Sequence, residues 1–150
     1  MFSLFKKKEF FSKEENDKII AAIRHAEECT SGEVRVFVER RCKFIDPLDR
    51  AMEIFSELKM QNTKDRNAVL VYVAIKDRQL AIYGDSGINA KTGEVYWKQE
   101  VDKMVSQFNK ENYADGISSC VTDIGLALQT YFPYDKETDK NELPDEIIFG

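Results

Sequence analysis

The segment Gly84-Asp85-Ser86-Gly87 carries residue types that could do chemistry. The same four letters surround the reactive serine in one large class of serine proteases, so Ser86 has to be considered as a nucleophile. Such a serine needs a base within hydrogen-bond reach, usually a histidine. The chain has a single histidine, His25, which the helical pattern places on the solvent side of the first expected helix. We therefore interpret the segment as a turn, in which Gly84 and Gly87 supply permissive backbone dihedrals.

Asp85 is more informative than Ser86 because it stands at the end of an expected strand, with Asn89 and Glu94 downstream. Carboxylate and amide oxygens that converge from loops are the ligands of calcium and magnesium. The alternative is that Asp85 and Asn89 form side-chain turns, while Glu94 helps to cap a helix. The spacing leaves both interpretations open.

The hydrophobic pattern predicts helices and strands in alternation. A capping box, Ser12-Lys-Glu-Glu15, starts a helix whose apolar stripe extends to Ala26. Alternating valines predict a strand at residues 33–39, and the unbroken apolar run 68–75 predicts a central strand that is covered on both faces. Between them, Asp46-Pro47 provides an N-cap and a first-turn proline for a second helix.

The second half of the pattern completes the fold. A short turn joins the central strand to residues 79–83, which predicts an antiparallel hairpin. Apolar stripes at 97–108 and 117–131 predict two further helices, and Pro133 stops the last one. This order predicts an α/β fold, namely a three-layer α/β/α sandwich with a small mixed sheet and helices on both faces.

The predicted topology brings three strand ends to one edge of the sheet. If the first two strands are parallel and the third pairs antiparallel, their ends at Glu33, at 65–67 and at Gly84-Asp85 lie together. Glu33 and Asp65 would then be neighbours of Asp85 in space, and both could serve as ligands to the same cation.

Composition excludes several classes of partner. The chain has 27 acidic and 22 basic residues and a net charge of -5, which argues against nucleic acid or an anionic membrane as a partner. Its three cysteines, Cys29, Cys42 and Cys120, have no spacing typical of disulfides or zinc, so we expect a cytoplasmic location. We expect neither a signal peptide nor a transmembrane segment.

The pattern divides the chain into three parts. Residues 1–10 are expected to be a flexible N-terminus, 11–133 one folded domain, and 134–150 an acidic C-terminal tail. Acids in the tail approach the spacing of an EF-hand loop, but Lys140 replaces the required glycine and Pro144 interrupts the loop. We expect a solvated tail whose last apolar residues could dock back on the domain.

Taken together, several motifs resemble the TPM domain family. They are Thr30-Ser31-Gly32-Glu33-Val-Arg-Val, Asp65-Arg66-Asn67-Ala-Val-Leu-Val-Tyr-Val, Ile82-Tyr-Gly-Asp-Ser-Gly-Ile88 and Tyr113-Ala-Asp-Gly-Ile117. The resemblance covers roughly residues 10–133 and implies an α/β/α sandwich. For some members it also implies calcium binding, and an acid phosphatase activity has been proposed. The glycine and acid at the strand end match Gly84 and Asp85, and the start of the last helix matches Asp115-Gly116.

Our preferred hypothesis is a cytoplasmic TPM domain that acts as a binding or regulatory module for a divalent cation, Ca²⁺ or Mg²⁺. Asp85 is the central ligand, with Glu33, Asp65, Glu94 and Asp115 as further contributors. One alternative, an enzyme by resemblance only, is a metal-dependent acid phosphatase that would hold phosphate with a cation such as Arg66. Another is a scaffold without a site, which recruits a protein partner. No residue can be matched to a catalytic nucleophile.

Overall fold

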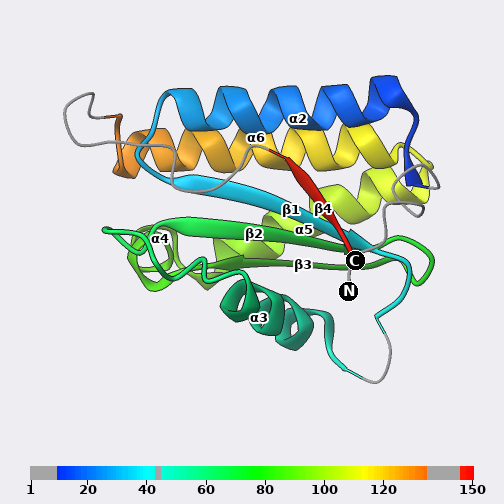
Figure 1. Ribbon diagram of the computed structural model, residues 1–150, viewed down its shortest axis with the longest axis horizontal. Coiled ribbons are helices and arrows are strands. Elements are labelled where there is room, and N and C mark those ends of the chain that lie inside the picture. The colour runs from blue at the N-terminus through cyan, green and yellow to red at the C-terminus, as the bar shows by residue number, and fades with distance from the viewer. Residues whose placement is uncertain (1–9, 43–44, 135–145) are drawn as a thin grey trace.

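The computed structural model describes residues 10–42, 45–134 and 146–150. Within these ranges it contains five helices and a mixed sheet of four strands (Figure 1). The elements follow in the order α2 (Lys13–Glu28), β1 (Glu33–Glu39), α3 (Pro47–Glu57), β2 (Ala68–Ala74), β3 (Gln79–Gly84), α4 (Ser86–Thr92), α5 (Glu94–Asn109), α6 (Tyr113–Tyr131) and β4 (Ile147–Phe149).

The strand order in the sheet is β3-β2-β1-β4. β1 and β2 are parallel from the pair Glu33 and Ala68 to the pair Glu39 and Ala74. β2 and β3 are antiparallel, as the short turn between them predicted. β4 pairs in parallel with the other edge of β1. The predicted mixed sheet is confirmed, and β4 extends it by a strand that the pattern did not predict.

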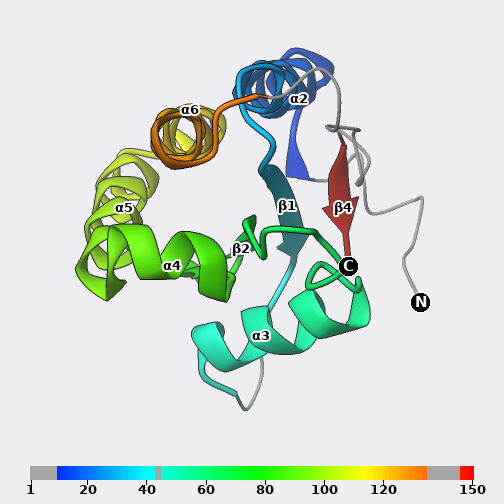
Figure 2. The same ribbon diagram turned by 90° about the vertical axis from the view of Figure 1, so that its left-hand side faces the viewer.

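Helices cover both faces of the sheet, which confirms the α/β/α sandwich. α2, α5 and α6 lie on one face and α3 on the other (Figure 2). Successive side chains of a strand point to opposite faces of the sheet. In β2, Val69, Val71 and Val73 therefore join the larger core, whereas Leu70 and Tyr72 pack beneath α3. The unbroken apolar sequence of β2 is therefore the result of burial on both faces.

Local signals at the helix starts act as predicted. The Ser12 hydroxyl accepts a hydrogen bond from the Glu15 amide at 3.1 Å, and the Glu15 carboxylate accepts one from the Ser12 amide at 2.9 Å. Asp46 caps α3 by accepting from the Leu48 amide at 3.0 Å. Both caps satisfy amides that have no partner inside the helix.

Charged contacts attach α3 to the sheet. The Arg50 guanidinium donates to Glu39 of β1 at 3.0 and 3.1 Å, and to Glu53 at 3.2 Å. These hydrogen bonds raise the pKa of Arg50 above its usual value.

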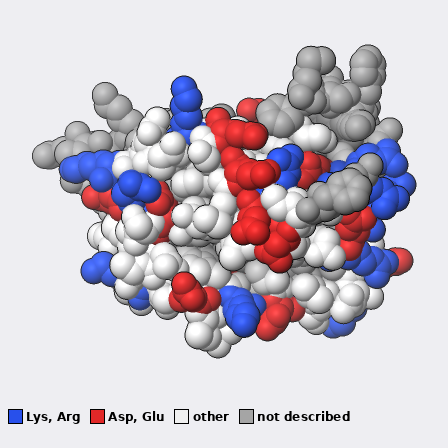
Figure 3. All heavy atoms as spheres, turned by 90° about the horizontal axis from the view of Figure 1, so that it is seen from below, with Lys and Arg blue, Asp and Glu red and all other residues white. Residues whose placement is uncertain are grey.

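On the face seen from below, acidic side chains gather near the middle with basic side chains around them (Figure 3). This face therefore offers a mixed surface rather than a continuous basic one.

The glycines of the Gly84-Asp85-Ser86-Gly87 segment serve close packing, so the expectation of permissive dihedrals was wrong. Among the described glycines, only Gly93 has a positive φ. A Cβ on Gly84 would lie 2.4 Å from Cζ2 of Trp97, and a Cβ on Gly87 would lie 2.0 Å from the carbonyl oxygen of Asp65. The expected turn is in fact the start of the short helix α4.

The end of the chain belongs partly to the domain. Phe149 is buried, and its ring lies 5.8 Å from that of Phe10 and 6.4 Å from that of Phe11, centroid to centroid. The Gly150 amide donates to the carbonyl of Val38 at 2.8 Å. The apolar end thus docks back, as expected, and does so as a strand. Of residues 1–10, which we expected to be flexible, the structure describes only Phe10, and the EF-hand-like acids before Glu146 also lie outside the described residues.

Replacing Gly87 by alanine tests the close packing. The new Cβ would meet backbone, which cannot swing aside, so we expect Gly87→Ala to lower the free energy of unfolding by about 1–3 kcal/mol. Ser86→Ala is the matched control, because Ser86 is exposed and its substitution should change stability by less than about 0.5 kcal/mol. Urea unfolding measures both, and equal stabilities of the two variants would contradict the packing argument.

A second substitution tests the contribution of β4. Phe149→Ala removes a buried ring, and we expect a loss of about 3–5 kcal/mol in the free energy of unfolding. Ile148→Ala is the control on the same strand, since Ile148 is only half-buried and should cost less. A Phe149→Ala variant as stable as the wild type would mean that β4 does not dock in solution.

Candidate functional site

Asp85 connects β3 to α4 and is almost completely buried, with 1% of its surface exposed. Its amide donates to the carbonyl of Ala68 at 3.0 Å, which continues the β2–β3 ladder by one residue. Its Oδ1 accepts from the Ser86 amide at 2.7 Å, so the carboxylate caps α4. Asp85 therefore has a structural role at this position whatever else it binds.

The carboxylate of Asp85 also forms a bidentate ion pair with Arg66. The guanidinium Nε lies 2.7 Å from Oδ2, and Nη2 lies 2.9 Å from Oδ1. The pair raises the pKa of Arg66, because the Asp85 carboxylate accepts its hydrogen bonds and adds an opposite charge. Two N–H donors in one plane match both carboxylate oxygens, and this makes such pairs strong and specific.

The backbone around Arg66 holds the two partners together. Arg66 has a φ of 51°, which is uncommon for a residue with a side chain. Its carbonyl oxygen accepts from the Gly87 amide at 2.8 Å and from the Ile88 amide at 3.3 Å. The loop before β2 thus satisfies the Gly87 and Ile88 amides in the first turn of α4, and this requires the loop to pack directly on Gly87.

The predicted convergence of strand ends is confirmed for the backbone. The Glu33 amide donates to the carbonyl of Asn67 at 3.4 Å, and the loop at Asp65 lies against Gly87, beside Asp85. Glu33 is buried, whereas the side chain of Asp65 is exposed. Residues 33, 65–67 and 84–87 therefore share one edge of the sheet.

The other two proposed ligands lie at the starts of other helices. Glu94 is exposed in the first turn of α5, and Asp115 in the first turn of α6 forms an ion pair with Lys18 of α2. Within residues 10–42, 45–134 and 146–150, no group of three or more His, Cys, Asp or Glu side chains is arranged to hold a metal ion. The oxygen atoms around Asp85 can coordinate a cation only if the cation displaces the Arg66 guanidinium from the Asp85 carboxylate.

Within the part of the chain that the structure describes, the base and the cation named by the two catalytic hypotheses have other partners. His25 lies on the solvent side of α2, where its Nδ1 is 3.7 Å from Glu28 Oε2, and Ser86 begins α4. Arg66, the cation that the phosphatase hypothesis assigns to phosphate, is engaged by Asp85.

The pattern did not reveal the buried acid of α5. Glu100 is 3% exposed and lies on the same helix face as Trp97, Met104 and Phe108. Its spacing from these apolar residues was the available signal, because an acid at that position of an apolar stripe must be buried or paired.

Comparison with known proteins defines the family. The model of the TPM domain matches residues 4–127, and the chain therefore belongs to the TPM domain family. The chain is also similar to the BA42 protein of the psychrophilic bacterium Bizionia argentinensis, with 43% identity and a TM-score of 0.86. That match covers 98% of this chain and 100% of the other.

Two more distant solved structures share the fold. The N-terminal domain of a P. gingivalis protein has 18% identity and a TM-score of 0.69, with 81% and 78% of the two chains covered. The N-terminal domain of the cg2496 protein of Corynebacterium glutamicum has 14% identity and a TM-score of 0.65, with 81% and 76% covered. A search of curated proteins gave no match.

None of the described helices has the length and apolar character needed to cross a membrane.

Two substitutions of Asp85 separate its roles. Asp85→Asn keeps a capping side chain but removes the charge that pairs with Arg66, whereas Asp85→Ala removes both. We expect both variants to be less stable than the wild type. The free energy of unfolding of the alanine variant should be about 1 kcal/mol below that of the asparagine variant. Urea unfolding measures the difference, and equal stabilities would show that the cap contributes nothing.

Proposed function

We propose that this TPM domain is a binding module that takes a divalent cation, Ca²⁺ or Mg²⁺, at the sheet edge around Asp85. The observation that supports the proposal is the bidentate contact of Arg66 with Asp85, because this buried carboxylate already requires a positive charge beside it. The carbonyl oxygen of Asp65 lies against the start of α4, and oxygen donors of this kind suit both ions.

In this proposal the cation competes with Arg66. The side chain of Arg66 is 51% exposed, so it can turn into solvent while its backbone carbonyl stays on α4. Glu33 and Asp65 share the edge and would be the nearest acidic contributors. Glu94 and Asp115 belong to other helix starts and should contribute less.

The proposed location is the cytoplasm, and the proposed role is regulatory, with a protein partner that responds to the bound ion. Support for the location comes from the cysteines. Cys29, Cys42 and Cys120 are all free thiols in the structure. A reducing compartment maintains cysteines in this form.

A cation titration of four variants tests the site. We expect calcium or magnesium to shift the backbone amide signals of residues 65–67 and 84–89 in the ¹⁵N spectrum of the wild type. Arg66→Gln should bind the ion several-fold more tightly because the competing charge is gone, and Asp85→Asn should abolish the shifts. Glu94→Gln and Asp115→Asn are matched controls that remove a carboxylate elsewhere and should leave the affinity nearly unchanged.

The outcome that refutes the site is specific. If neither the wild type nor Arg66→Gln shows saturable shifts at these residues with millimolar calcium or magnesium, the edge does not bind a cation. Tighter binding by Asp85→Asn than by the wild type would equally refute it. Chelator-sensitive hydrolysis of phosphomonoesters that Asp85→Asn loses would instead favour the phosphatase alternative.

A further inference from the structure

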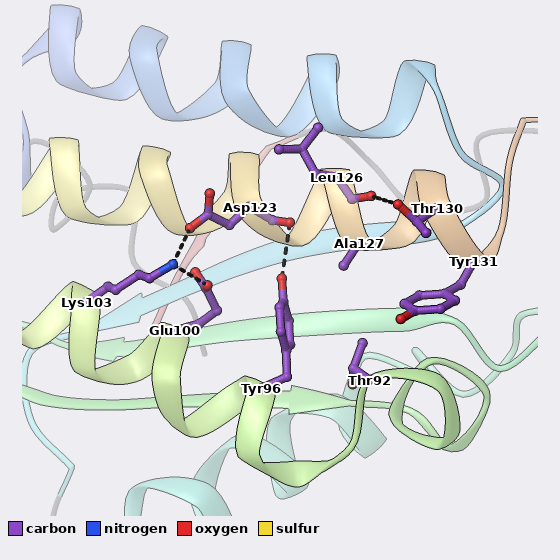
Figure 4. Close-up of a pocket in the computed structure, with 9 residues that line it drawn as sticks. All are labelled: Thr92, Tyr96, Glu100, Lys103, Asp123, Leu126, Ala127, Thr130 and Tyr131. Carbon is purple, nitrogen blue, oxygen red and sulfur yellow. Dashed lines mark hydrogen bonds and ion pairs between the residues drawn. The ribbon is translucent and has the colours of Figure 1, made fainter.

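A separate pocket of about 390 Å³ opens between α5 and α6 (Figure 4). The end of α4 closes one side of it through Thr92. None of the residues that line the pocket belongs to the edge around Asp85. It is therefore a second candidate site, independent of the proposed cation site.

One end of this pocket holds two acids and one base. Glu100 projects from α5, and Lys103 of the same helix places its Nζ 3.1 Å from Glu100 Oε2 and 3.4 Å from Oδ2 of Asp123 on α6 (Figure 4). The side chain of Lys103 is 66% exposed, whereas that of Glu100 is only 4% exposed. The base thus approaches the acids from the solvent side.

One oxygen of the buried acid has no partner. Glu100 Oε1 is inaccessible to solvent and accepts no hydrogen bond within the described part of the chain. A buried carboxylate oxygen without a donor is unfavourable. Burial, followed by the neighbouring Asp123, raises the pKa of Glu100, and Lys103 opposes this shift. With both acids ionised, one ammonium group serves two carboxylates, so the pocket favours a further positive charge.

The other end of the pocket presents mainly carbon, together with the hydroxyl of Tyr131 (Figure 4). The Tyr96 hydroxyl donates to the carbonyl of Asp123 at 3.1 Å, and the Thr130 hydroxyl donates to the carbonyl of Leu126 at 2.9 Å. These hydroxyl hydrogens are therefore engaged within the protein. Leu126 and Tyr131 remain 59% and 43% exposed beside them and present apolar surface to the opening.

From this arrangement we propose that the pocket binds an organic cation, a primary ammonium group on an aliphatic stem. The ammonium donates to the carboxylates of Glu100 and Asp123, and the stem packs against Leu126 and Tyr131. Lys103 turns outward to admit it. Anions are disfavoured because this end of the pocket carries two acids. Either a free alkylamine or the lysine side chain of a protein could supply this chemistry.

Titration with matched probes tests the proposal. n-Pentylammonium chloride and the neutral isostere 1-pentanol are added to the ¹⁵N-labelled protein at constant ionic strength. We expect saturable shifts of amides in residues 96–103 and 123–131 with the ammonium only. Nα-acetyl-lysine amide and Nα-acetyl-norleucine amide form a second pair, and binding of the lysine compound shows that a peptide can supply the group.

Two substitutions make the result specific. Glu100→Gln should weaken n-pentylammonium binding by about tenfold or more, because a charge-assisted hydrogen bond is lost. Lys103→Met should strengthen binding several-fold, because it removes the resident ammonium and keeps the stem. A purely structural role of Lys103 would not produce this gain. Lys103 is at the surface, so this test remains even if Glu100→Gln fails to fold.

Three outcomes would overturn the proposal. They are no saturable shift with either ammonium compound in the wild type and in Lys103→Met, equal binding of 1-pentanol, and equal movement of the same amides by calcium chloride. Since shifts at 96–103 and 123–131 differ from those at 65–67 and 84–89, failure here is distinguishable from failure of the proposed cation site.

Discussion

The direct contact between the loop before β2 and the start of α4 determines the geometry of the sheet edge. The Asp65 carbonyl approaches Gly87 so closely that a methyl group cannot be accommodated. The Arg66 carbonyl accepts hydrogen bonds from the Gly87 and Ile88 amides of α4. The same approach places the guanidinium of Arg66 on the carboxylate of Asp85. The backbone contact of residues 65–66 with α4 and the ion pair of Arg66 with Asp85 therefore support each other. Each holds the loop before β2 at the distance from α4 that the other requires.

This dependence explains why a carboxylate can be buried at a strand end. Asp85 is surrounded by donors from two elements, the Ser86 amide and the Arg66 guanidinium, which together compensate for lost hydration. Glu100 shows the contrasting case, with one oxygen paired and the other not. Of Asp85 and Glu100, Asp85 is the one whose two carboxylate oxygens both accept hydrogen bonds within the protein.

Much of the fold follows from local sequence signals. The capping box at Ser12, the Asp46 cap and the uninterrupted apolar run of β2 each act within one element, so their outcome depends little on the rest of the chain. β4 could not be predicted in this way, because its three residues pair with β1 only after the chain has returned from far away. Three residues are also too few to show the alternation or the apolar run by which a strand is predicted.

The candidate site was predictable only at the level of the backbone. Strand order was enough to bring residues 33, 65–67 and 84–87 to one edge. Which side chains pair there was not predictable, since the ion pair of Arg66 with Asp85 depends on the left-handed conformation of Arg66. Likewise, the need for glycine at positions 84 and 87 arises from Trp97 and Asp65, which are distant in the pattern and pack against these two residues in the fold.

The parallel pairing of β4 with β1 also has a consequence for folding. The partners Val36 and Ile147 are far apart in sequence, and contacts between such distant residues form slowly. During synthesis, β1 therefore presents an unpaired edge until residues 147–149 leave the ribosome. An open edge of this kind invites pairing with another chain. The nascent protein should consequently be most prone to aggregation late in translation, when the rest of the sheet already exists.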